Sequence, residues 1–325
     1  MNYEEFKTEL QEKIQEKFLQ NIEFVSEMVS LTNETVEGMV LKFQGSEGMD
    51  ITIYPKRLYE KYKAGITMPE IAECFSKEIT HALQNQPAMP EITVENAARC
   101  VRFSLINKER NKELLDKCPH IDVFDMAGVI RWHISEKESF LVDTNIMHKL
   151  QMTREELLMI AKKNTENGKF VCKEMAQLMR ELMLGNGIDK EVVDESIPVV
   201  KTPFYVVSSE NYFEGSAAML SNTFLLEVAN QLKCEELYII PSSRHEIIVS
   251  GSNSVFDSQA LKSIVQEVNS DSKIMKKEDF LSNSIYKYNA KSFTFSICDS
   301  KGLFQDGKGN KKDNAKKDSG KGRKL

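Results

Sequence analysis

The last third of the chain alternates strand-like and helix-like segments in an order that restricts its possible folds. The strand-like segments are rich in β-branched and aromatic residues and are 204–208, 236–240, 245–250 and 284–297. The helix-like segments carry apolar residues at helical spacing and are 216–232 and 258–269. The resulting order, β-α-β-β-α-β, predicts a ferredoxin-like unit over residues 201–300.

The preceding 200 residues indicate two further modules that mix helices and strands. Apolar residues recur at every fourth position over 3–19, which predicts an amphipathic helix, and β-rich runs over 22–54 precede a second helix at 68–84. Pro87 and Pro90 then mark a boundary. We therefore expect an α+β protein with an N-terminal module at 1–90, a middle module at 91–200 and a C-terminal module at 201–300.

The charges of the chain are unevenly distributed. Residues 301–325 contain nine Lys or Arg and three Asp, and since the whole chain carries a formal net charge of −6, residues 1–300 carry −12. Such an acidic body repels phosphate backbones. The 301–325 segment has too few apolar residues to offset the entropy of ordering, so we expect a disordered basic tail. Two roles stay open for this tail, a solubilising segment and a tether to nucleic acid or another anionic surface.

The six cysteines indicate a reducing compartment rather than a disulfide framework. None forms a Cys-x-x-Cys pair, and most lie in apolar stretches where a buried, reduced thiol is expected. The spacing of Cys118 and His120 does not match a known zinc ligand set, so we predict no metal site and no cofactor. No run of apolar residues is long enough to span a membrane, and the first residues lack the basic start and apolar stretch of a signal peptide. These features predict a cytoplasmic protein without membrane association.

The segment PSSRHE at 241–246 is the strongest candidate for chemistry. Ser243, His245 and Glu246 are residue types that a hydrolase needs for its nucleophile, its base and the group orienting the base. Adjacent strand residues point to opposite faces, however, so Glu246 is poorly placed to orient His245. A turn whose hydroxyls satisfy backbone amides explains the same residues, and it also suits a ligand-binding turn formed by Ser242, Ser243 and His245.

Two other segments contain candidate polar residues. Gly215 and Ser216 lie where a loop enters a helix, and a helix N-terminus can bind an anion; chain reversal at the glycine and capping by the serine explain the same pair. His120, Asp122 and Asp125 could serve as acid, base or metal ligands, although a proline-induced loop entering a strand explains them equally.

Several long segments resemble a known family. They are TIYPKRLYEKYKAGITMPEIAECF, FSLINKERNKELLDKCPHI, AAMLSNTFLLEVANQL and LYIIPSSRHEIIV. In this order they are similar to a bacterial family catalogued as domain of unknown function 5688, which is typical of anaerobic Gram-positive bacteria and often encoded near mobile-element genes. The resemblance spans most of residues 1–297 and implies a cytoplasmic bacterial protein. It implies no activity, cofactor or catalytic residue.

The sequence leaves the biochemical activity unknown and favours a non-catalytic cytoplasmic binding or accessory protein, for which the resemblance implies a link to mobile elements. Such a protein would bind a protein partner or associate with itself. One alternative is a hydrolase that uses Ser243 and His245. Another is a protein that holds nucleic acid through residues 301–325.

Overall fold

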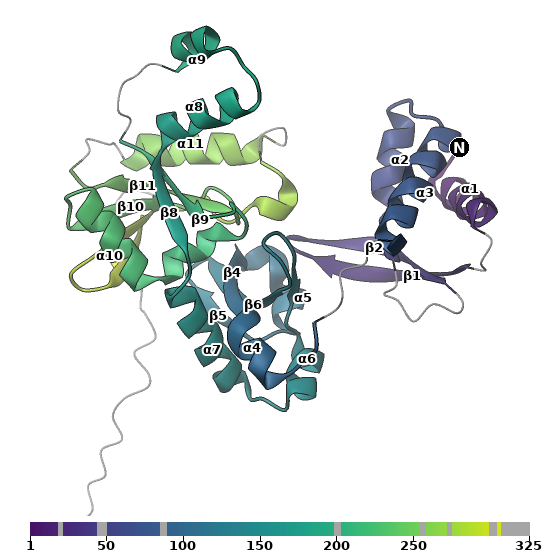
Figure 1. The fold of residues 1–325 in the computed structure, drawn as a ribbon, viewed down its shortest axis with the longest axis horizontal. Coiled ribbons are helices and arrows are strands. Elements are labelled where there is room, and N and C mark those ends of the chain that lie inside the picture. Colours follow the sequence, from purple (N-terminus) through teal and green to yellow (C-terminus); the bar gives the residue numbers. More distant parts are fainter. Residues whose placement is uncertain are drawn as a thin grey trace, which may run out of the picture. The chain divides into compact units, whose positions relative to one another are not determined.

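The computed structural model forms two compact units, each mixing helices with antiparallel sheets (Figure 1). The described residues are 1–18, 22–43, 51–84, 90–197, 203–253, 258–271, 275–298 and 304–306. Unit 1 comprises Met1–Asp122, Met126–Asn164 and Lys276–Phe280. Unit 2 comprises Val123–Asp125, Thr165–Met275 and Leu281–Leu325. The α+β class is confirmed, whereas separately folding domains with boundaries at 90 and 200 stay a prediction.

The N-terminal part of unit 1 packs three helices with a small antiparallel sheet. Its elements are α1 (Tyr3–Lys17), β1 (Ile22–Leu31), β2 (Glu34–Phe43), β3 (Ile51–Ile53), α2 (Pro55–Lys63) and α3 (Met68–Gln84). The strand order is β1-β2-β3. Phe6, Leu10 and Ile14 of α1 are fully buried in the same core as Leu41 of β2 and Ile79 of α3. The apolar period of four residues therefore identified the buried face of α1.

The rest of unit 1 is built around a second antiparallel sheet, in which β6 pairs with β4 and β7. Its strands are β4 (Val101–Asn107), β5 (His120–Val123), β6 (Met126–His133) and β7 (Ser139–Leu141). Its helices are α4 (Val94–Cys100), α5 (Lys112–Leu115), α6 (Thr144–Leu150) and α7 (Arg154–Glu166), and the 3₁₀ helices of unit 1 are η1 (Glu109–Asn111) and η3 (Lys277–Asp279). Trp132 of β6 is fully buried, which makes it a core residue.

Unit 2 is organised around a seven-stranded antiparallel sheet of order β14-β13-β12-β10-β11-β9-β8. Its strands are β8 (Phe170–Glu174), β9 (Tyr205–Ser209), β10 (Glu236–Ile240), β11 (Glu246–Gly251), β12 (Tyr286–Asn289), β13 (Thr294–Cys298) and β14 (Phe304–Asp306). Its helices are α8 (Met175–Gly185), α9 (Lys190–Ser196), η2 (Gly215–Leu220), α10 (Asn222–Gln231) and α11 (Ser258–Ser270). Figure 1 shows α8 between α9 and α11.

The strand order of unit 2 does not confirm the predicted ferredoxin-like unit. The elements β9-α10-β10-β11-α11-β12 follow the predicted sequence of types. In space, however, the β10–β11 hairpin lies in the centre, with β9 beside β11 and β12 beside β10. A ferredoxin-like sheet instead places its first strand in the interior. The order of elements along the chain is compatible with both strand arrangements, the observed one and the ferredoxin-like one. In each, a helical crossover can connect two strands that have another strand between them.

Two further predictions for unit 2 need correction. The predicted helix over 216–232 is divided, because Ser221 ends η2 and its side chain caps the N-terminus of α10. The tail predicted to be disordered from residue 301 contains β14, which pairs with β13. Residues 301–303 and 307–325 of that tail lie outside the described residues, so the prediction is corrected only for Phe304–Asp306. Among the helices that the structure describes, none combines the length and apolar character needed to cross a membrane.

Candidate functional site

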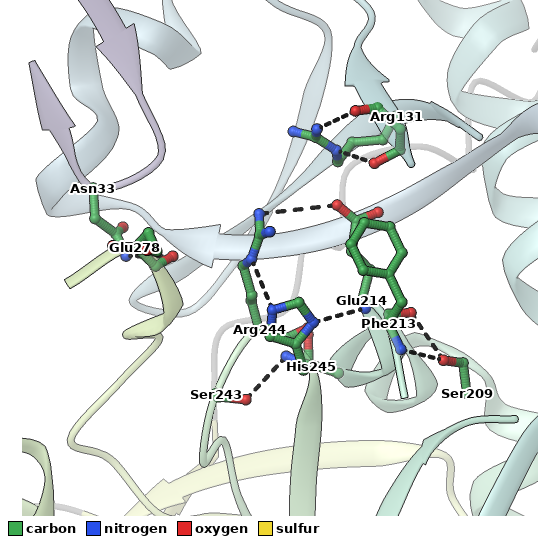
Figure 2. A network of polar contacts seen from close by, with 11 residues as sticks. Asn33, Arg131, Ser209, Phe213, Glu214, Ser243, Arg244, His245 and Glu278 are labelled. Atoms are coloured by element: carbon green, nitrogen blue, oxygen red, sulfur yellow. Dashed lines mark hydrogen bonds and ion pairs between the residues drawn. The ribbon is translucent and has the colours of Figure 1, made fainter. Parts of the chain in front are cut away.

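The turn between β10 and β11 is joined by hydrogen bonds to the segment that follows β9 (Figure 2). The backbone N–H of Gly215 donates to the carbonyl oxygen of His245 at 3.0 Å. Ser208 Oγ donates to the same oxygen at 2.6 Å, and Ser216 Oγ donates to the carbonyl oxygen of Arg244 at 2.7 Å. The two separate groups of candidate residues, at 215–216 and 242–246, therefore form one cluster.

The close approach of the two segments requires a glycine at 215. A Cβ atom at this position would lie 2.2 Å from the backbone nitrogen of Ser209 and 2.6 Å from the carbonyl oxygen of His245. Backbone atoms on both sides leave no room for a side chain. Gly215 is thus explained by packing between the loop and the turn.

The hydroxyl of Ser243 is engaged within the turn. Its Oγ donates to Glu246 Oε1 at 2.9 Å and accepts from the backbone N–H of His245 at 3.0 Å. The backbone N–H of Ser243 also donates to the carbonyl oxygen of Glu246 at 3.1 Å. Ser243 is only 7% exposed. These contacts connect Ser243 to the backbone of His245 rather than to its imidazole, so the geometry resembles a capped turn more than an activated nucleophile.

The imidazole of His245 faces the loop that follows β9. Its Nδ1 accepts from the backbone N–H of Glu214 at 3.2 Å, and its ring packs against Phe213 with centroids 5.7 Å apart. Arg244 Nε lies 3.3 Å from the other ring nitrogen, Nε2. A neutral imidazole accepts a hydrogen bond at only one ring nitrogen at a time, so the Glu214 N–H at Nδ1 and the Arg244 Nε–H at Nε2 are alternative donors to the ring. The ring is therefore fixed as a packing and hydrogen-bonding group.

Glu214 and Arg244 form a charged pair beside this ring, which the sequence analysis did not identify. The Glu214 side chain is 1% exposed and the Arg244 side chain 18%, and Glu214 Oε1 lies 4.0 Å from Arg244 Nη1. Glu214 also has a left-handed backbone conformation, with φ of 52°. A buried carboxylate needs compensating charge and hydrogen bonds, and Arg244 supplies a positive charge close to the Glu214 carboxylate.

The candidate residues of the 118–125 segment have separate partners. His120 Nδ1 lies 2.9 Å from the carbonyl oxygen of Cys118, and Asp122 pairs with Lys108 at 2.9 Å. Asp125 accepts hydrogen bonds from the hydroxyl groups of Ser282, Ser284 and Tyr286. Among the residues that the structure describes, no three His, Cys, Asp or Glu side chains gather as a metal site would require.

Ser242 differs from its neighbours because it lines an apolar groove of about 180 Å³ in unit 2. Met175 of α8 and three residues of α11 line the same groove, together with Ile240 of β10 and Ile248 of β11. The three residues of α11 are Leu261, Val265 and Val268. Since α8 and α11 are distant in sequence, no local pattern predicts this groove. One side of the turn at 241–246 thus belongs to the polar cluster, and the other side lines the apolar groove.

Comparison with known proteins gives one match. The model described as "Family of unknown function (DUF5688)" matches residues 3–290. No curated protein and no solved structure matches the chain at a significant level. The family predicted from the resemblance of the four quoted segments is therefore confirmed, and this protein belongs to the family of unknown function DUF5688.

Proposed function

We propose that this protein is a non-catalytic binding or accessory protein of the bacterial cytoplasm that holds a protein partner on unit 2. The observation that supports the proposal most directly is the exposure of α8. Met179 and Leu182 of this helix are 49% and 57% exposed, whereas large apolar side chains on a helix are normally packed. Leu184 near the end of α8, Ile188 in the connection and Val192 of α9 are further exposed apolar side chains.

The position of the exposed residues on α8 strengthens this argument. The half-buried Met175 and the exposed Met179 and Leu182 follow each other at i, i+4 and i+7, so they form one stripe. On the helix this stripe lies between the buried residues Leu178 and Ala176. The middle of an apolar face is usually its most buried part. An exposed middle with buried flanks is the pattern of a helix whose central contact is made by another molecule.

The polar cluster at the β10–β11 turn supports a role without catalysis. The hydroxyls of Ser208 and Ser216 hold the turn against the segment around the end of β9, and the hydroxyl of Ser243 hydrogen-bonds within the turn itself. The serine hydroxyls that a hydrolase would need therefore have a structural role in this cluster. It also supports the groove, because Ser242 in the same turn lines it.

The cytoplasmic location proposed here is supported by the state of the cysteines. All six are free thiols, and Cys118 and Cys298 are buried. Burial raises the pKa of the Cys118 thiol to about 12 and that of Cys172 to about 11. Such thiols stay protonated and unreactive at neutral pH.

The proposal predicts intermolecular contacts that involve unit 2. We expect a lysine-reactive cross-linker, applied to cells that make the native protein, to join Lys190 or Lys262 to one other protein, because both lysines lie on helices beside α8. Mass spectrometry of the cross-linked peptides provides the measurement, and Lys149 and Lys163 of unit 1 serve as comparison sites. If cross-links formed only between copies of this chain, the proposal of a different protein partner would be wrong and self-association would take its place. A folded protein without intermolecular cross-links would contradict the proposal.

The hydrolase alternative predicts a different result at Ser243. Because Ser243 Oγ contacts Glu246 and the His245 backbone rather than the imidazole, we expect a fluorophosphonate probe to leave this residue unlabelled. We also expect Ser243→Ala to lower the free energy of unfolding by about 1–3 kcal/mol, since two hydrogen bonds of a buried group are lost. Peptide mapping of the probe and urea denaturation provide the two measurements. Stoichiometric labelling at Ser243 would favour the hydrolase.

A further inference from the structure

The groove of unit 2 has the form of a receptor for one large apolar side chain. Leu261, Val265 and Val268 lie on one face of α11 at i, i+4 and i+7, and they form one wall. Met175 of α8 also lines the groove. The volume of the groove, about 180 Å³, suits one leucine or phenylalanine side chain better than a whole cofactor. An anchor residue in such a pocket contributes much of the binding energy of an interface.

The groove continues into the exposed stripe of α8. Met175 belongs to both, since it lines the groove and begins the stripe of Met179 and Leu182. An occupant that inserts one side chain between α8 and α11 can therefore extend along α8 with further apolar contacts. Apolar side chains at successive turns of a helix provide this arrangement, as in other complexes where a helix lies in a groove.

The charges around the groove and the α8 stripe favour a basic occupant. Asp189, Glu191 and Glu195, at and just before α9, are exposed, and Arg180 is engaged with Asp194 and the carbonyl oxygen of Ile197. With the basic residues Lys190 and Lys262 counted, α8, α9, α11 and Asp189 together carry six acidic and three basic side chains, so the acidic ones prevail. Residues 1–300 together carry a net charge of −12. A second copy of the chain would bring like charges together, while lysine and arginine on the partner would steer its approach.

We infer that the groove between α8 and α11 binds a basic amphipathic helix of a protein partner, with one large apolar side chain inserted into the groove. This inference rests on the proposed function and adds the chemistry of the partner. Self-association through α8 is the alternative that the test must separate, because the same apolar stripe could pair with itself.

The test uses the full-length protein and a fluorescein-labelled synthetic helix of Leu, Ala and Lys, with leucine at i, i+3, i+4 and i+7. Fluorescence anisotropy measures its Kd, beside a scrambled peptide and a peptide with Glu in place of Lys. We expect binding of the basic amphipathic helix alone. Met179→Asp and Val268→Asp should each weaken it at least about tenfold, because both place a charge on the contact surface.

A matched substitution controls for the added charge. Met159 of α7 in unit 1 is 67% exposed, so Met159→Asp should fold equally well and leave the Kd unchanged. Circular dichroism confirms that all three variants are folded. Equal binding of the scrambled or acidic peptide, or an unchanged Kd in both unit 2 variants, overturns the inference. A dimer in sedimentation that Leu182→Asp dissociates also overturns it in favour of self-association.

The results separate this inference from the proposed function. If the peptide does not bind but Lys190 or Lys262 cross-links to another protein in cells, a partner exists and the basic-helix inference is wrong. If neither result is obtained, the proposed function fails together with the inference.

Discussion

Replacing Gly215 by alanine should lower the free energy of unfolding of unit 2 by about 3 kcal/mol, because no side-chain movement can make room for the new methyl group. The Cβ would lie 2.2 Å from the Ser209 nitrogen and 2.6 Å from the His245 carbonyl oxygen, and both are backbone atoms. Separating the loop from the turn would also break the hydrogen bond from the Gly215 N–H to His245. Urea denaturation and the melting temperature measure the effect.

Gly185 provides the matched control for this substitution. It is the last residue of α8 in the same unit, and a Cβ there would meet no atom within 4 Å. Gly185→Ala should therefore leave unit 2 as stable as before or stabilise it by up to about 1 kcal/mol, since alanine is the better helix former. If both substitutions changed the stability equally, the close approach at Gly215 would not be the cause.

The parts of the fold that depend on local pattern could be predicted from the sequence. The helix α1 buries Phe6, Leu10 and Ile14 as their spacing indicates, because a helix buries one stripe whatever its partner is. The order of strands in unit 2 could not be predicted in this way. The position of β9 beside β11 is set by pairing between residues about forty positions apart, for example between Val206 and Ile248, and no local signal specifies it.

In the candidate site too, residues in a local sequence pattern could be predicted, whereas contacts between residues distant in sequence could not. Ser243 and Glu246 were identified because turn residues are concentrated in PSSRHE. Glu214 and Arg244 were missed, since a charged residue in a single sequence is expected at the surface and only the folded chain reveals that its partner is thirty positions away. The exposure of Leu182 was equally hidden, because an amphipathic pattern predicts a buried face without naming the molecule that covers it.

Removal of the Arg244 charge should have the second large effect on unit 2. Arg244→Met keeps much of the side-chain volume but removes the positive charge that lies 4.0 Å from the Glu214 carboxylate, which is 1% exposed. Breaking a buried pair from one side costs about 3 kcal/mol or more, and the partial exposure of Arg244 places the expected loss at about 2–3 kcal/mol. Lys291→Met, which removes an exposed ion pair with Glu235 in the same unit, should change the stability by less than about 1 kcal/mol.

A double substitution tests whether the charge of Glu214 causes this loss. Glu214→Gln replaces the carboxylate by a neutral amide of the same shape, so combining it with Arg244→Met removes the buried negative charge together with the Arg244 cation. We expect the double variant to be more stable than Arg244→Met alone, with a coupling free energy of at least about 1 kcal/mol in the double-mutant cycle. Urea denaturation of the four proteins provides the measurement. Strictly additive losses would mean that Arg244 stabilises the turn by packing and not through the carboxylate.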